Sequence, residues 1–184
     1  MPVKSKLEIR RTSVNKAMPA LAQKLQKFKD ISVKLALSER FQEALKMCDA
    51  GIEMLEASAE KETETGIKWL AALHSAKGAT YMAQKNFEGA KGAYEKALEL
   101  HAMLPRGMEF SYALDNLAKA YQVVGDIQNS IACKTASLEN LEEFAPNSKD
   151  LIASKYRILA RELDNSGRSA EAIEMRRKAQ KLEG

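Results

Sequence analysis

The sequence predicts an all-α fold, a right-handed superhelix (solenoid) built from four helix pairs. Alanine, leucine, lysine and glutamate are abundant, and the 184 residues include only 4 prolines, which favours helices throughout. In addition, a spaced pattern of small and large apolar residues recurs four times along the chain. A single helix pair cannot bury its apolar face alone, so we expect consecutive pairs to stack on one another.

The clearest copy of the pattern covers residues 77–98, KGATYMAQKNFEGAKGAYEKAL. Its apolar residues recur at helical spacing and the spacing breaks once, over residues 84–86. This copy therefore predicts a helix, a tight turn and a second helix that packs on the first.

The other three copies repeat these positions with different fidelity. The third contains LDNLAKAY at residues 114–121 and places Gly125 where a turn with positive φ is expected. The fourth covers residues 156–179, and the first and weakest covers residues 28–52. One small residue of the pattern advances along the chain with periods of 46, 40 and 42 residues, from Ala44 to Ala90, Ser130 and Ala172.

This spacing resembles the tetratricopeptide repeat, in which small and large residues alternate across a helix pair. The resemblance implies that Gly78 is the small residue at which the two helices of its pair approach closely. The lengthened period resembles the kinesin light chain and its relatives, whose repeats carry the core L-x-N-L-A-x-x-Y that residues 114–121 reproduce. The resemblance implies a non-enzymatic module that binds other proteins. Lys134 and Arg176 depart from the family because they stand where a large packing residue is usual, and we expect the helices that carry them to expose that face.

Charge divides the chain into a basic end and a helical domain. Residues 1–40 hold ten Lys or Arg against three acids, and the whole chain has a net charge of +4. We expect residues 1–14 to form a flexible basic arm, either a solubilising tail or a contact for acidic partners, lipid headgroups or nucleic acid. The helical domain should span residues 15–184, with repeats at about 15–60, 65–104, 107–146 and 149–183.

Several classes of protein are disfavoured by what the sequence lacks. His74 and His101 have no cysteine or carboxylate at the spacing of metal ligands, so we expect neither an enzyme nor a cofactor. No apolar run approaches the roughly 20 residues of a membrane span, and no signal-peptide pattern opens the chain. Cys48 and Cys133 are widely separated thiols, which favours a reducing, cytoplasmic location.

The candidate binding surface consists of the residues of each first helix that packing leaves unused. In stacked helix pairs these residues face the inner, concave side, where a partner peptide can lie. In the third repeat they are Tyr112, Asp115, Asn116, Lys119, Gln122 and Val123, and in the fourth Ser154, Arg157, Ile158, Arg161, Asp164 and Asn165. From the inner positions of all four repeats we predict these peptide-binding residues: Lys29, Met82, Asn116, Lys119, Arg157 and Arg161.

Asn116 carries the most specific expectation. A carboxamide can donate to and accept from a peptide backbone at once, and the resemblance to kinesin light chains implies that Asn116 holds the main chain of a target peptide. The neighbouring cations favour a ligand that carries Asp, Glu, phosphate or a terminal carboxylate. In the alternative interpretation, Arg157 and Arg161 pair with local acids such as Glu162 and Asp164 on a solvated face.

Three other functions can be compared with the same residues. Co-chaperone tetratricopeptide domains clamp a terminal carboxylate with lysines and asparagines, but Val33 and Ala76 stand where asparagines belong, so chaperone-tail binding is disfavoured. A self-associating scaffold that forms homo-oligomers through the last repeat is the main alternative. Nucleic-acid binding through the basic ends is disfavoured because aromatic residues make up only 6% of the chain.

Overall fold

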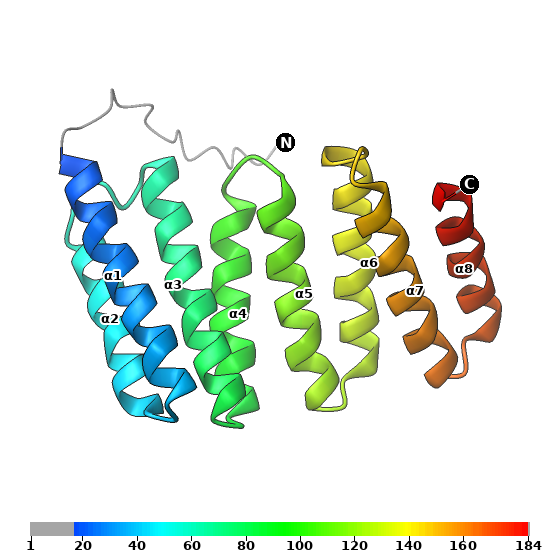
Figure 1. Cartoon of the computed structure of the whole chain (residues 1–184), viewed down its shortest axis with the longest axis horizontal. Helices are drawn as coiled ribbons and strands as arrows, with labels where there is room; N and C mark the ends of the chain where they lie inside the picture. The colour runs from blue at the N-terminus through cyan, green and yellow to red at the C-terminus, as the bar shows by residue number, and fades with distance from the viewer. Residues whose placement is uncertain (1–16, 184) are drawn as a thin grey trace, which may run out of the picture. The chain divides into compact units, whose positions relative to one another are not determined.

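The computed structural model describes residues 17–183, and this part of the chain forms eight α-helices and no strand (Figure 1). The predicted all-α class is confirmed, whereas the predicted arm at residues 1–14 lies outside the described residues. The helices are α1 Ala17–Leu37, α2 Phe41–Glu56, α3 Glu64–Ala83, α4 Phe87–Ala102, α5 Met108–Val123, α6 Ile127–Phe144, α7 Lys149–Asn165 and α8 Ser169–Glu183.

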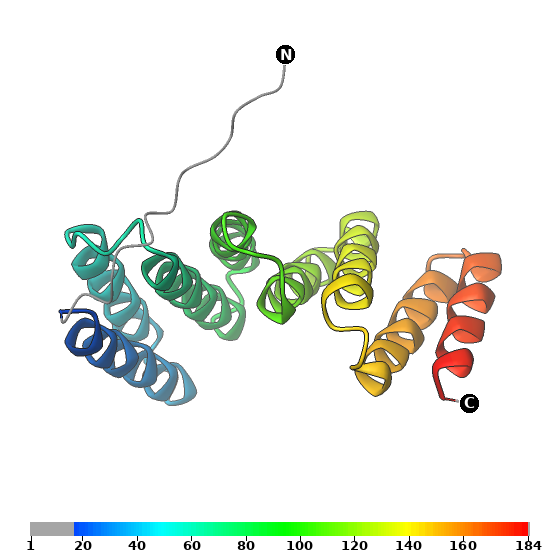
Figure 2. The same cartoon turned by 90° about the horizontal axis from the view of Figure 1, so that it is seen from above.

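Consecutive helices form pairs, α1 with α2, α3 with α4, α5 with α6, and α7 with α8. Within each pair the two helices lie side by side in both views (Figure 1; Figure 2). The chain divides into two compact units, with α1–α4 in the first and α5–α8 in the second, and the division falls between Pro105 and Arg106. This division falls between the second and third repeats of the sequence pattern. The single helical domain over residues 15–184 stays a prediction.

The turn inside each pair has the same backbone conformation in all four repeats. One residue in each turn has a positive φ: 58° at Glu39, 61° at Lys85, 82° at Gly125 and 79° at Gly167. The second helix of each pair begins two residues later. The positive φ predicted at Gly125 is therefore confirmed. At Glu39 and Lys85 a residue with a side chain adopts this left-handed conformation, which costs about 1–2 kcal/mol that glycine avoids.

Polar side chains fix where three of the helices begin. Thr63 accepts a hydrogen bond from the backbone N–H of Gly66 at 3.0 Å, just before α3. Asn86 and Asp126 cap α4 and α6 in the same way, at 3.0 Å and 3.2 Å. Each cap satisfies an N–H that has no partner inside the helix.

Each unit has its own apolar core. In the first unit Leu25, Leu55 and Leu73 are fully buried, which joins α1, α2 and α3. Gly78 of α3 lies against Tyr94 of α4, where an added Cβ would stand only 2.5 Å from the tyrosine ring. The predicted close approach at Gly78 is therefore present, and burial raises the pKa of Tyr94 to about 12. In the second unit the core includes Leu141 and Ile152.

We expect Gly125→Ala to lower the free energy of unfolding by about 1 kcal/mol, because alanine must then adopt a left-handed conformation. A Cβ at Gly125 would meet no atom within 4 Å, so the loss reports the backbone alone. The matched control is Gly92→Ala, which also meets nothing within 4 Å but lies inside α4 and should raise stability by roughly 0.5–1 kcal/mol. Urea denaturation measures both, and a shift of the same sign in the two variants would contradict the argument.

Candidate functional site

A cavity of about 400 Å³ lies among α5, α6 and α7 of the second unit, and we call it the α5–α7 cavity. Its wall on α5 consists of Tyr112, Asp115, Lys119 and Gln122. Lys134 of α6 lines it, as do four residues of α7: Leu151, Ser154, Lys155 and Ile158. Six of these nine residues occupy inner positions that the sequence pattern assigned to the first helices of the third and fourth repeats.

Two apolar side chains at the cavity are open to solvent. Tyr112 of α5 is 47% exposed and Ile158 of α7 is 43% exposed. Large apolar groups left this open on two facing helices are available to a ligand that covers them. The cavity therefore offers apolar contact area together with lysine ammonium groups.

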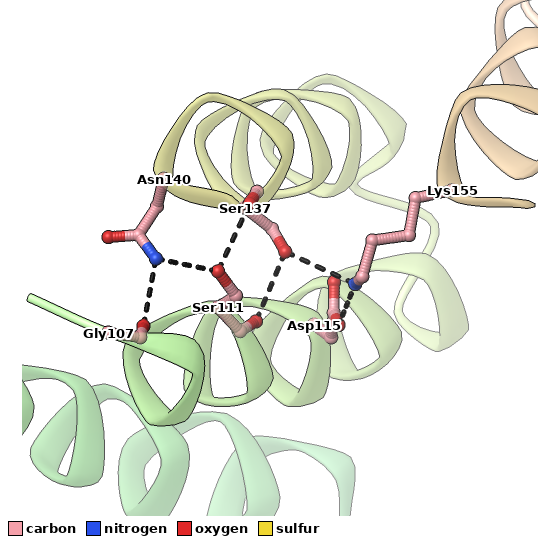
Figure 3. Close-up of polar contacts among 6 residues, drawn as sticks. All are labelled: Gly107, Ser111, Asp115, Ser137, Asn140 and Lys155. Carbon is pink, nitrogen blue, oxygen red and sulfur yellow. Dashed lines mark hydrogen bonds and ion pairs between the residues drawn. The ribbon is translucent and has the colours of Figure 1, made fainter. Parts of the chain in front are cut away.

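A buried ion pair joins the two helices that form the cavity walls. Lys155 of α7 pairs with Asp115 of α5 and also donates a hydrogen bond to the hydroxyl of Ser137 on α6, at 3.2 Å (Figure 3). The side chains of the ion pair are only 13% and 23% exposed. Because a buried ammonium without partners is costly, this contact holds α7 against both helices of the preceding pair.

Next to this ion pair, a hydrogen-bond ladder fixes α6 against α5. The hydroxyls of Ser111 and Ser137 each donate to the other residue's backbone carbonyl, at 3.1 Å and 3.2 Å (Figure 3). The Asn140 amide donates to the Ser111 hydroxyl and to the carbonyl of Gly107, both at 2.8 Å. All three side chains are buried, so their mutual bonds set the register of the two helices.

A second buried pair lies on the other side of the cavity. Lys134 of α6 pairs with Glu162 of α7, which also accepts a hydrogen bond from the hydroxyl of Ser130 at 2.6 Å. The side chains of the ion pair are 14% and 6% exposed. The expected exposure at Lys134 is therefore wrong, because Glu162 gives the buried ammonium a partner. At Arg176 the expectation is confirmed, since that residue is exposed.

The electrostatic surroundings of Lys134 show which charges gather here. Burial lowers the pKa of the Lys134 ammonium, the Asp115 carboxylate acts in the opposite direction, and Arg161 and Lys119 lower it further. Lys134 also lies 3.4 Å from the side-chain oxygen of Gln122, to which it donates. Cationic groups from α5, α6 and α7 are thus close enough to repel one another.

The structure places four of the six predicted peptide-binding residues in the second unit. Asn116 is half-buried on α5, and its side chain forms no hydrogen bond with any residue in the range 17–183. Lys119 lines the cavity and Arg161 is exposed on α7; neither has an ion-pair partner within the described chain. Arg157 pairs with Glu183 of α8, which leaves its charge compensated.

In the alternative interpretation Arg157 and Arg161 pair with local acids; Arg157 does form an ion pair, but not with a local acid, and Arg161 forms none with residues 17–183. Glu162 is taken by Lys134 and Asp164 by Arg176, so neither acid is the partner of Arg157. The partner that Arg157 does have, Glu183, lies 26 residues further along the chain. A local sequence argument could not identify it.

Lys29 and Met82, the other two predicted residues, belong to the first unit. Lys29 of α1 lies with its ammonium 5.6 Å from the centroid of the Trp69 ring on α3, which is a cation–π contact. Met82 is half-buried near the end of α3. These two residues are not among those that line the α5–α7 cavity.

Among residues 17–183 there is no group of three His, Cys, Asp or Glu side chains placed to hold a metal ion. No helix in that range has both the length and the apolar character that crossing a membrane requires.

Solved structures resemble this one. The nearly identical TPR-like repeats of a kinesin light chain from Podosopora anserina match 84% of this chain and 72% of their own, with 16% identity and a TM-score of 0.69. BtubC (BKLC) from P. vanneervenii matches over 93% of this chain and 74% of its own, with 13% identity and a TM-score of 0.71. No protein-family model and no curated protein matches the sequence.

At these identities the likeness concerns the fold. The chain has the tetratricopeptide-like repeat fold, so the resemblance that the sequence suggested is confirmed at that level.

We expect Lys155→Met to lower the free energy of unfolding by about 3 kcal/mol, because it leaves the Asp115 carboxylate mostly buried without its partner. Arg157→Met is the matched control on the same helix. Its ion pair is exposed, and the loss should be about 0.5 kcal/mol. Urea denaturation of the two variants measures the difference. Equal losses would show that the Lys155 contact does not hold α7 in place.

Proposed function

We propose that this protein is a non-enzymatic interaction module that binds a peptide segment of a partner protein in the α5–α7 cavity. The observation that carries the proposal is the cavity itself, with exposed Tyr112 and Ile158 beside lysine ammonium groups. A ligand that covers the apolar side chains gains free energy from their burial, and one with negative charge gains from the cations.

The state of Asn116 supports binding through the peptide backbone. Its carboxamide has one donor and one acceptor group, and neither is used by any residue that the structure describes. Asn116 is not among the residues that line the cavity, but on α5 it directly follows Asp115, which is one of them. An extended segment along this wall can exchange two hydrogen bonds with it.

The charge of the cavity favours an acidic segment. Lys134 is matched by the buried carboxylate of Glu162 and Lys155 by the half-buried carboxylate of Asp115, whereas Lys119 has no such partner among the described residues. The excess is therefore positive, in agreement with the preference for acidic ligands that the sequence predicts.

We expect Asn116→Ala to weaken peptide binding about tenfold, the effect of losing roughly 1.4 kcal/mol of hydrogen bonding, without changing stability by more than a few tenths of a kcal/mol. The measurement is fluorescence polarisation with peptides selected from a random display library on the intact protein. Asn147→Ala, in the exposed loop before α7, is the matched control and should bind like the parent. Unchanged affinity in the Asn116 variant would place the binding site elsewhere.

Self-association as a structural scaffold is the alternative, and it predicts a different behaviour in solution. A monomeric peptide receptor keeps one molecular mass across protein concentrations, whereas a scaffold subunit gains mass as concentration rises. Light scattering coupled to size-exclusion chromatography separates the two, and we expect a constant mass. A mass that increases with concentration would favour the scaffold.

A further inference from the structure

Three cations converge at the cavity from three different helices. Lys119 projects from α5, Lys134 from α6 and Arg161 from α7, one turn beyond Ile158 of the cavity wall. Both Lys119 and Arg161 act on the Lys134 ammonium as like charges. Lys119 and Lys134 line the cavity, and Arg161 stands on the helix that forms its opposite wall, close enough to act on Lys134.

The carboxylates nearby neutralise only part of this charge. Glu162 compensates Lys134, and Asp115 compensates Lys155. Lys119 and Arg161 have no acidic partner among residues 17–183, which leaves two positive charges in excess. Like charges held together at an exposed site raise the free energy of the unliganded protein, so a ligand with two negative charges at one point relieves the most repulsion.

The geometry of a peptide decides how those two negative charges can be delivered. In an extended segment adjacent side chains point to opposite faces, and two carboxylates on the same face are two residues, or roughly 7 Å, apart, so neither arrangement places two negative charges at one point. A phosphoryl group carries about −1.5 to −2 charge on a single side chain and has three strong acceptor oxygens. It can accept from lysine and arginine at the same time.

Uncharged donors and apolar contacts at the cavity fit the same ligand. The hydroxyls of Tyr112 and Ser154, on opposite walls, are further donors that the cavity offers. Exposed Ile158 provides apolar surface beside them for the residues that flank a modified side chain.

We propose that the α5–α7 cavity recognises a phosphorylated serine or threonine in the partner's peptide segment, with Lys119 and Arg161 as the residues that determine this specificity. The inference rests on the peptide-binding function proposed above. It differs from that function because it predicts that phosphorylation of the partner controls binding.

The test compares three degenerate peptide pools that differ only in their central residue, which is phosphoserine, serine or glutamate. Fluorescence polarisation with the intact protein measures the affinity for each pool. We expect the phosphoserine pool to bind at least about tenfold more tightly than the other two, the effect expected from two charge-assisted hydrogen bonds. Inorganic phosphate and O-phosphoserine, added as competitors, distinguish a peptide site from a site for any small anion.

Single variants locate the site. Lys119→Ala and Arg161→Ala should each abolish most of the preference for phosphoserine, since both side chains are exposed and their loss leaves the fold intact. Lys149→Ala is the matched control on α7, because this exposed lysine at the start of the helix does not line the cavity, and the variant should keep the preference. Thermal melts followed by circular dichroism verify that all three variants fold.

Each contrary outcome has a distinct meaning. Equal binding of the phosphoserine and glutamate pools overturns the phosphate inference and leaves an acidic-peptide receptor. If all three pools bind equally and Asn116→Ala still weakens their binding, the phosphate inference is overturned but the proposed function stands. Binding of no pool overturns both. Free phosphate that binds as tightly as the phosphoserine pool, or variants that keep the preference, overturns the assignment of the site.

Discussion

The Lys155 ammonium is the point on which the second unit depends. It lies among three helices, where burying an ammonium without partners is costly. Asp115 of α5 supplies the opposite charge, and the hydroxyl of Ser137 on α6 accepts a hydrogen bond. Those partners exist only when α7 packs against the preceding helix pair at one register. The walls of the α5–α7 cavity are consequently held by the same contact that joins the third repeat to the fourth.

This arrangement separates the total charge of the chain from the charge that acts at the cavity. Residues 17–183 contain 24 Lys or Arg and 24 Asp or Glu, so the net charge of +4 resides in residues 1–16. A balanced composition still yields a positive cavity, because Asp115 and Glu162 are directed into buried ion pairs while Lys119 and Arg161 remain at the edge. The positive excess at the cavity therefore follows from this placement of charges and not from their total.

The sequence predicts the repeats well because their packing is local. Helix pairs, the turn at Gly125 and the close approach at Gly78 depend on residues within one repeat, and all three are present. The contacts between repeats could not be predicted in the same way. Lys155 finds Asp115 across 40 residues, and Arg157 finds Glu183 across 26, so no local spacing identifies either pair. The inner positions were nevertheless sufficient to locate most of the cavity wall.

The exchange of one packing residue connects these observations. The second repeat uses Tyr94, a large and buried ring, at the place where the third repeat has Lys134. An aromatic ring gains free energy from burial alone, whereas a lysine there requires Glu162 on the next helix and tolerates few other arrangements. With lysine in place of tyrosine, the third repeat has less apolar packing at this position. Its ion pair instead fixes α6 against α7 and places a positive group at the cavity. The group that orders the junction of the helices thus also lines the cavity, so a single side chain both stabilises the helix packing and sets the charge of the cavity wall.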